Sequence, residues 1–277
     1  MKPFFSIIIP TLNEELFLPD LLINLSAQKS KNFEVIIVDA HSSDNTPNIA
    51  KSFKKKLNLK LFITNKQNVS FQKNLGVKKA RGKYMLFVDA DCKLKSAFTK
   101  QFETTILEKK GLIFFPYINP EEKTKQIEAI YQFLNFVVDI SQNTKKPFPS
   151  IGCMCYEKNL FNLIGGFDEK ILVQEDFNIA KKSREWGVIG RHLPNVKFTV
   201  SFRKIKKEGK LKALYRLIVG SVHYLVDGDT QKKLFDIDMG GHLYNKKELR
   251  VRKSKFINFD LKKIKAYFNE LFLETES

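Results

Sequence analysis

The sequence predicts an α/β fold in which a mainly parallel central sheet is flanked by helices. Three observations support this prediction. Short apolar runs alternate with helical stretches through the first 120 residues, these runs are rich in β-branched and aromatic residues, and aspartates follow two of them directly. Strands buried on both faces of a parallel sheet have this composition. Ligands bind such sheets beyond the carboxyl ends of the strands, so a site is expected there.

Five strands are expected in this part of the chain, at residues 4–9, 33–39, 60–64, 83–89 and 111–117. Helices are expected between them, with Pro19 and Pro47 in first turns, where proline is tolerated. Residues 120–200 keep the mixed character but are less regular. Two amphipathic helices are expected further on, at 209–226 and 259–274. We therefore predict one domain over residues 1–205 and a basic amphipathic helical extension over 206–277.

The composition limits the partners that the protein can have. The 277 residues carry a formal net charge of +18, which predicts attraction to nucleic acid, anionic lipid or phosphorylated small molecules. The three cysteines cannot all pair and fit no zinc pattern, so a reducing compartment is expected. No apolar run reaches the roughly 20 residues of a membrane helix. The expected location is therefore cytoplasmic, either free or peripheral on the cytoplasmic face of the membrane.

Residues 203–216 hold seven lysines and arginines and are followed by an apolar run that ends at residue 226. This pattern fits attachment to an anionic membrane surface. It fits equally a helix that packs on the catalytic domain and keeps its lysines in solvent.

Asp89 and Asp91 directly follow the apolar run MLFV. If the extended conformation persists through Ala90, both carboxylates lie on the same side of the strand. Two like charges so placed repel unless a cation lies beside them. A hard divalent ion, Mg2+ or Mn2+, is the predicted cofactor, because carboxylate oxygens are the ligands that such ions prefer.

Four motifs follow one another along the chain: FSIIIPTLNEE, VIIVDAHSSDNT, ARGKYMLFVDAD, and GGFDE followed by ED. Over roughly residues 4–200, their order and spacing resemble the family 2 glycosyltransferases of the GT-A fold. The resemblance implies an inverting enzyme that moves a sugar from a nucleotide diphosphate donor to a hydroxyl or lipid phosphate, in glycan or glycolipid assembly. The Q-x-x-R-W motif of processive polysaccharide synthases is absent, so a processive synthase is not expected.

Two alternatives stay open at this point. A nucleotidyltransferase of sugar phosphates also uses an α/β sheet and metal-binding carboxylates, but it needs a glycine-rich basic loop near the N-terminus. Near its N-terminus this chain instead has the acidic stretch PTLNEELFLPD. A nucleic-acid-binding protein would fit the charge alone, because no DNA- or RNA-binding signature accompanies it.

On the donor side, the resemblance implies that the residues after the first strand contact the nucleoside: Pro10, Thr11, Asn13 and Glu14. Thr11 and Glu14 also fit a capping box. Asp39 is expected to accept a hydrogen bond from an imide N–H, which uracil, thymine and guanine carry, or else to act as a cap or turn residue. A UDP-sugar is therefore the first expectation, then a GDP- or dTDP-sugar. Lys73 is expected either near the diphosphate or in solvent.

For the metal, the resemblance implies that Asp91 is a direct ligand and that Asp89 lies nearer the ribose or a metal-bound water. Ala90, between them, is expected among the residues that bind the nucleotide sugar. His192 or His242 could be a further ligand, although an ordinary polar or capping histidine fits each position equally.

On the acceptor side, the GGFDE loop is expected beneath an unidentified glycan or lipid-linked acceptor, through Gly165, Gly166, Asp168 and Glu169. Asp176 matches the family's catalytic base, and Glu175 is its acceptor-side neighbour. Both acids open a predicted helix, whose dipole would stabilise the charged, proton-accepting carboxylate. The alternative is that they only cap this helix.

Overall fold

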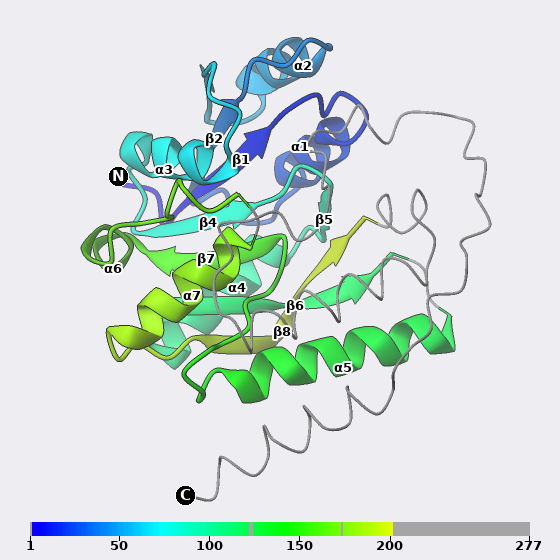
Figure 1. The fold of residues 1–277 in the computed structure, drawn as a ribbon. Coiled ribbons are helices and arrows are strands. Elements are labelled where there is room, and N and C mark those ends of the chain that lie inside the picture. Colours follow the sequence, from blue (N-terminus) through cyan, green and yellow to red (C-terminus); the bar gives the residue numbers. More distant parts are fainter. Residues whose placement is uncertain (1, 122–123, 173, 202–277) are drawn as a thin grey trace, which may run out of the picture. The chain divides into compact units, whose positions relative to one another are not determined.

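The computed structural model describes residues 2–121, 124–172 and 174–201 (Figure 1). In this part of the chain, eight strands form one mixed sheet in the order β3-β2-β1-β4-β7-β6-β8-β5. The strands are β1 Phe5–Thr11, β2 Phe33–Asp39, β3 Leu59–Ile63, β4 Tyr84–Val88, β5 Cys92–Leu94, β6 Ile113–Pro120, β7 Cys153–Glu157 and β8 Arg191–Val200. The helices are α1 Leu18–Ser26, α2 Thr46–Ser52, the 3-10 turn η1 Phe53–Lys55, α3 Val69–Lys79, α4 Phe98–Lys109, α5 Lys125–Ser141, α6 Lys158–Leu163 and α7 Glu175–Glu185.

The five predicted strands are all present, with ends that shift by a few residues. Strands β1 to β4 are parallel, as expected. Strand β7 then enters antiparallel between β4 and β6, so the strand predicted at 111–117 is not a direct neighbour of β4. Strands β5, β7 and β8 were not predicted. β5 is only three residues long, and Pro194 and Lys197 interrupt the apolar pattern of β8.

The sheet separates two apolar cores, because side chains along a strand alternate between its faces. Ile7 and Ile9 of β1 belong to one core and Ile8 to the other, which explains why the run SIII is buried throughout. The first core packs against apolar side chains of α1, α2 and α4, and the second against those of α3, α6 and α7. Helix α5 packs beside β6. This arrangement leaves the ends of the strands for polar loops.

Three buried residues, Cys92, Cys153 and Cys155, are free cysteines. Within the described ranges, no helix has both the length and the apolar character needed to cross a membrane. Several predictions concern residues outside the described part of the chain: the extension 206–277 with its two helices, the basic segment 203–216, and His242.

Candidate active site

The loops that follow β1 and β2 interlock at the carboxyl edge of the parallel strands. The side-chain oxygen of Asn13 accepts hydrogen bonds from the backbone N–H of Ser43, at 2.8 Å, and from its hydroxyl, at 3.2 Å. In return, the N–H of Asn13 donates to Ser42 Oγ at 2.8 Å, and the N–H of Glu14 donates to Thr46 Oγ1 at 2.7 Å. The predicted nucleoside loop, residues 10–14, is therefore held in one conformation by the second loop.

Thr11 does not cap a helix. It is the last residue of β1, and its hydroxyl donates to Asp39 at 2.7 Å, whereas α1 begins only at Leu18. The predicted capping box between Thr11 and Glu14 is therefore wrong. The carbonyl of Glu14 accepts hydrogen bonds from the N–H groups of Phe17, at 3.1 Å, and Leu18, at 2.9 Å, so a turn separates Glu14 from the helix.

Asp39 is fully buried and uses its carboxylate within the protein. One oxygen accepts from the hydroxyls of Thr11, at 2.7 Å, and Ser42, at 2.6 Å, and the other accepts from the N–H of Ser42 at 2.8 Å. These contacts show Asp39 in the turn role that was the alternative expectation. That Asp39 also accepts an imide N–H from the base stays a prediction.

Residues 89–92 form a turn instead of continuing β4. The carbonyl of Asp89 accepts a hydrogen bond from the N–H of Cys92 at 3.0 Å. The extended conformation that would place Asp89 and Asp91 on the same side is therefore absent. Behind this turn lies Gly152, whose carbonyl accepts from the N–H of Asp89 at 2.9 Å and from Cys92 Sγ at 3.3 Å.

Gly152 was not among the residues predicted from the sequence. Its φ is +90°, and a Cβ at this position would lie 3.6 Å from Asp89 Oδ2. A glycine just before a buried strand was the only sequence feature that pointed to it.

The two acids of the DAD motif consequently have different surroundings. Asp91 lines a cavity of about 130 Å³ together with Asp20, Lys93 and Glu121. The Lys93 ammonium lies 2.9 Å from Glu121 Oε1 and 3.8 Å from Asp20 Oδ2. Asp89 instead acts electrostatically on Lys73 and Asp176.

The donor set beside Asp91 consists of hard carboxylate oxygens. In the described part of the chain, no group of three or more His, Cys, Asp or Glu side chains could hold a metal ion by itself. Mg2+ is usually bound by one or two carboxylates together with phosphate oxygens. Among the described residues, these carboxylates would therefore hold a divalent ion together with oxygens of another ligand, and a diphosphate would supply such oxygens.

His192 does not belong to this site. Its Nε2 lies 3.3 Å from Asn135 Oδ1 and its Nδ1 lies 3.7 Å from Asp139 Oδ1, both on α5. Burial lowers the pKa of His192. His192 pairs with Phe115 of β6, whereas Cys92 lies level with Pro120 of the same strand, on the other side of β8. Phe115 and Pro120 are five residues apart, which is roughly 16 Å along a strand. The prediction that His192 is a further metal ligand is therefore wrong. His192 lies at the start of β8, whereas the turn with Asp89 and Asp91 lies beside the end of this strand.

Lys73 of α3 joins the two acids that open α7. Its Nζ lies 2.7 Å from Asp176 Oδ1, 2.9 Å from Glu175 Oε1, and 4.9 Å from the centre of the Phe167 ring. The lysine side chain is only 2% exposed. The prediction of a solvated lysine is wrong, and its ammonium faces the proposed base.

An excess of acids over bases in this buried cluster explains the shifted pKa values of Asp176 and Lys73. Burial raises the pKa of Asp176 to about 7; Lys73 opposes this shift, whereas Glu175 and Asp89 add to it. Burial would lower the pKa of Lys73, yet Asp176, Glu175 and Asp89 together raise it well above its usual value. Three acids act on one ammonium, so Lys73 stays charged. Because one positive charge does not balance three negative charges, Asp176 keeps its proton up to a higher pH than an ordinary aspartate does. The helix dipole was expected to favour the charged form of Asp176, but burial outweighs it.

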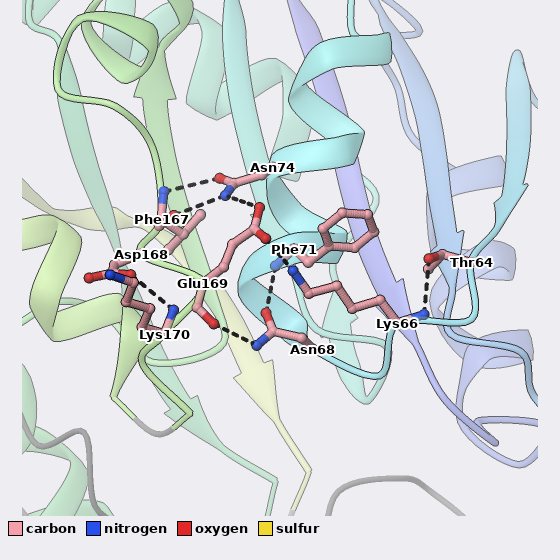
Figure 2. A network of polar contacts seen from close by, with 9 residues as sticks. All are labelled: Thr64, Lys66, Asn68, Phe71, Asn74, Phe167, Asp168, Glu169 and Lys170. Atoms are coloured by element: carbon pink, nitrogen blue, oxygen red, sulfur yellow. Dashed lines mark hydrogen bonds and ion pairs between the residues drawn. The ribbon is translucent and has the colours of Figure 1, made fainter.

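The GGFDE loop is clamped onto α3 (Figure 2). The side-chain oxygen of Asn74 accepts from the N–H of Phe167 at 3.0 Å, and its amide N–H donates to the Phe167 carbonyl at 2.9 Å and to Glu169 at 3.2 Å. Glu169 also pairs with Lys66, and its carbonyl accepts from Asn68 at 3.0 Å. Asp168 accepts from the N–H of Lys170 within the loop. The carboxylate of Glu169 therefore serves to dock the loop.

Gly165 and Gly166 both have positive φ, +77° and +63°. A Cβ on Gly166 would lie 2.8 Å from Asn74 Oδ1, so only glycine allows the clamp to close here. Asn74 and Asn68 were not among the predicted site residues.

Comparison with known proteins identifies the family. Residues 6–165, more than half of the chain, match the family model described as glycosyl transferase family 2. The chain belongs to this family. It is 31% identical over 187 residues to a PGL/p-HBAD biosynthesis glycosyltransferase of Mycobacterium bovis BCG, and the match covers 64% of this chain and 69% of that protein.

A second relative is the poly(ribitol-phosphate) beta-N-acetylglucosaminyltransferase TarS of Staphylococcus aureus. It is 40% identical over 91 residues, which make up 31% of this chain and 16% of TarS. The chain therefore matches only a small part of that relative's length.

Solved structures confirm the predicted GT-A fold. The structure of S. aureus TarS 1-349 in complex with UDP-GlcNAc aligns with a TM-score of 0.59 at 23% identity, over 80% of this chain and 67% of that chain. The mannosyltransferase PcManGT from Pyrobaculum calidifontis, in complex with GDP-Man and Mn2+, aligns with a TM-score of 0.59 at 16% identity, over 79% and 65%. At these identities the likeness establishes the fold alone.

Proposed function

We propose that the protein is an inverting glycosyltransferase that moves a sugar from a nucleoside diphosphate to an acceptor hydroxyl or lipid phosphate, with Asp176 as the general base. The observation that carries this proposal is the cluster of Lys73, Glu175 and Asp176 beside Asp89, at the edge of the sheet where the nucleoside loops lie. A base with a pKa near 7 is suited to accept a proton at neutral pH.

The proposed reaction is a single displacement. The acceptor oxygen attacks the anomeric carbon from the side opposite the diphosphate, so the configuration of the sugar inverts. The proton of an acceptor hydroxyl passes to Asp176, whereas a lipid phosphate is already anionic. The bond from the anomeric carbon to the diphosphate breaks, and its electron pair leaves with the nucleotide. Lys73 binds Asp176 Oδ1 and thereby fixes the orientation of the carboxylate toward the acceptor. Glu175 shares the same ammonium and lies beside the base.

The proposed donor is a UDP-sugar first, then a GDP- or dTDP-sugar. The printed titles of two fold relatives, with UDP-GlcNAc in one and GDP-Man with Mn2+ in the other, support this class. A bound Mn2+ or Mg2+ would neutralise charge on the leaving diphosphate. Asp91 would hold that ion, and Asp89 would lie nearer the ribose or a metal-bound water.

The acceptor side is proposed to run along the clamped loop, through Gly165, Gly166 and Asp168. The basic segment 203–216 supports access to an acceptor on an anionic membrane surface. Co-sedimentation of the full chain with vesicles of anionic lipid at low salt tests this part. Equal sedimentation with neutral vesicles would remove the membrane from the proposal.

The function is tested by a screen of nucleotide sugars for slow hydrolysis in the presence of Mn2+. We expect UDP release from at least one UDP-sugar, and calorimetry should show that Mn2+ tightens UDP binding in the native protein but not in Asp91→Asn. Asp20→Asn is the matched control, because Asp20 lines the same cavity and pairs only distantly with Lys93. Release of pyrophosphate from a nucleoside triphosphate and a sugar phosphate would instead establish a nucleotidyltransferase. Absence of any nucleotide-sugar turnover or binding would overturn the proposal.

A further inference from the structure

The buried ammonium of Lys73 has a neighbour that is not an acid. Its Nζ lies over the ring of Phe167, 4.9 Å from the ring centre. The negative face of an aromatic ring attracts a cation, and the attraction is stronger where water is excluded. The Lys73 side chain and Phe167 are each only 2% exposed, so little water reaches this contact.

Burial distinguishes this contact from the other lysine–aromatic contacts. Six lysines lie over aromatic rings within residues 2–121, 124–172 and 174–201. Five of these lysines are exposed, and Lys73 is the buried one. Exposed contacts of this kind contribute little, whereas desolvated ones contribute more. The ring of Phe167 therefore adds to the forces that hold this ammonium in place.

Phe167 is itself held firmly by its ring and by its backbone. The centre of its ring lies 5.1 Å from that of Phe87 in β4 and 5.5 Å from that of Phe161 in α6, both edge to face. Its N–H and its carbonyl are both hydrogen-bonded to the Asn74 side chain. Asn74 directly follows Lys73 in α3. The backbone of the GGFDE loop is therefore fixed by the residue next to the lysine that its ring covers.

We infer that Phe167 is a positioning residue whose ring holds the Lys73 ammonium against Asp176, an inference that rests on the proposed function. The loop proposed to line the acceptor site thereby also orients the proposed base. An aliphatic side chain would fill similar space, but it has no negative ring face to hold the ammonium. Phe167 takes no part in the transfer of the sugar, because it carries no group that can accept a proton.

The first test measures the coupling between ring and ammonium without any substrate. Urea denaturation of Phe167→Leu, Lys73→Met and the double variant gives their interaction energy. The double variant should lose less stability than the two single losses together, by about a tenfold change in the unfolding equilibrium constant. The control cycle pairs Lys73→Met with Phe161→Leu. Phe161 belongs to the same aromatic cluster, and no lysine of the described ranges lies over its ring, so this cycle should be additive.

The second test keeps the shape of the ring. Difluorophenylalanine in place of Phe167 withdraws electron density from the ring face and so weakens its attraction for the ammonium. We expect kcat to fall about fivefold for hydrolysis of the nucleotide sugar that the native protein hydrolyses fastest. The affinity for the matching nucleoside diphosphate, measured by calorimetry with Mn2+, should stay the same, because only the base is displaced. The same replacement of Phe161 should change neither quantity.

Three results would overturn the inference and leave the proposed function intact. The first is a coupling no larger than in the control cycle, and the second is an unchanged kcat with difluorophenylalanine in place of Phe167. The third is a loss of nucleotide affinity as large as the loss of kcat, which would show a general structural role. If the native protein hydrolysed no nucleotide sugar, the proposed function would fail and the positioning role with it, whereas the coupling in urea would be unaffected.

Discussion

Lys73 Nζ lies 2.7 Å from Asp176 Oδ1, which ties the middle of α3 to the first turn of α7. The two residues are 103 positions apart in the chain. Both are buried, and Glu175 accepts a second hydrogen bond from the same ammonium at 2.9 Å. This pair therefore does two jobs: it holds two helices together across the edge of the sheet, and it sets the protonation of the proposed base.

Removal of the ammonium should cost stability. In Lys73→Met a side chain of similar length leaves Asp176 and Glu175 without their shared cation, and breaking a buried pair in this way typically costs about 3–5 kcal/mol. Urea denaturation monitored by circular dichroism measures the change. Lys78→Met is the control, because Lys78 is exposed in the last turn of the same helix. A loss no larger than in the control would show that the pair contributes little.

Replacement of the proposed base should affect turnover and spare nucleotide binding. General-base catalysis typically accelerates a reaction about 10²- to 10⁴-fold, so Asp176→Asn should lower kcat by that factor at nearly unchanged UDP affinity. Glu175→Gln, which alters the neighbouring acid on the same ammonium, should lower kcat much less. If Asp176→Asn turned over normally and Glu175→Gln did not, the role of base would pass to Glu175.

The pH dependence should follow the pKa of Asp176, which burial raises to about 7. The base works only when deprotonated, so kcat/KM should fall as the pH drops below about 7. Glu175 contributes to raising this pKa and Lys73 lowers it. The acidic limb should therefore move to lower pH in Glu175→Gln and to higher pH in Lys73→Met. Shifts of the opposite sign would separate this limb from Asp176.

The loop clamp can be tested with two glycines of similar conformation. Gly166 and Gly187 have φ of +63° and +76°, but a Cβ would lie 2.8 Å from Asn74 Oδ1 at Gly166 and would meet nothing within 4 Å at Gly187. Gly187→Ala should cost only the strain of the left-handed conformation, roughly 1–2 kcal/mol. Gly166→Ala should cost more, because Asn74 must also move from Phe167. Equal urea midpoints for the two variants would show that the clamp is unimportant.

The sequence predicted the elements that follow local rules. The apolar runs became strands because their β-branched residues are buried on both faces, and Glu175 and Asp176 open a helix as expected. Some wrong predictions concern distant partners: Thr11 bonds to Asp39 instead of capping a helix, and His192 meets Asn135 of α5. Another is local, because residues 89–92 form a turn where an extended strand was expected. Nothing in the local sequence of Lys73 shows that α7 will bring two acids to its ammonium.

Strand β7 lies antiparallel beside β4 although it follows β4 by more than 60 residues, and this matters while the chain is being synthesised. Tyr84 pairs with Glu157 and Val88 with Cys153, so one edge of β4 has no partner until a much later part of the chain is made. All five residues of β4, YMLFV, are buried in the finished sheet. An apolar edge strand without a partner is a template for aggregation. A chain that stops after residue 150 should therefore sediment as aggregate, whereas one that includes both β7 and β8 should not, because β7 covers the open edge of β4 and β8 covers that of β6.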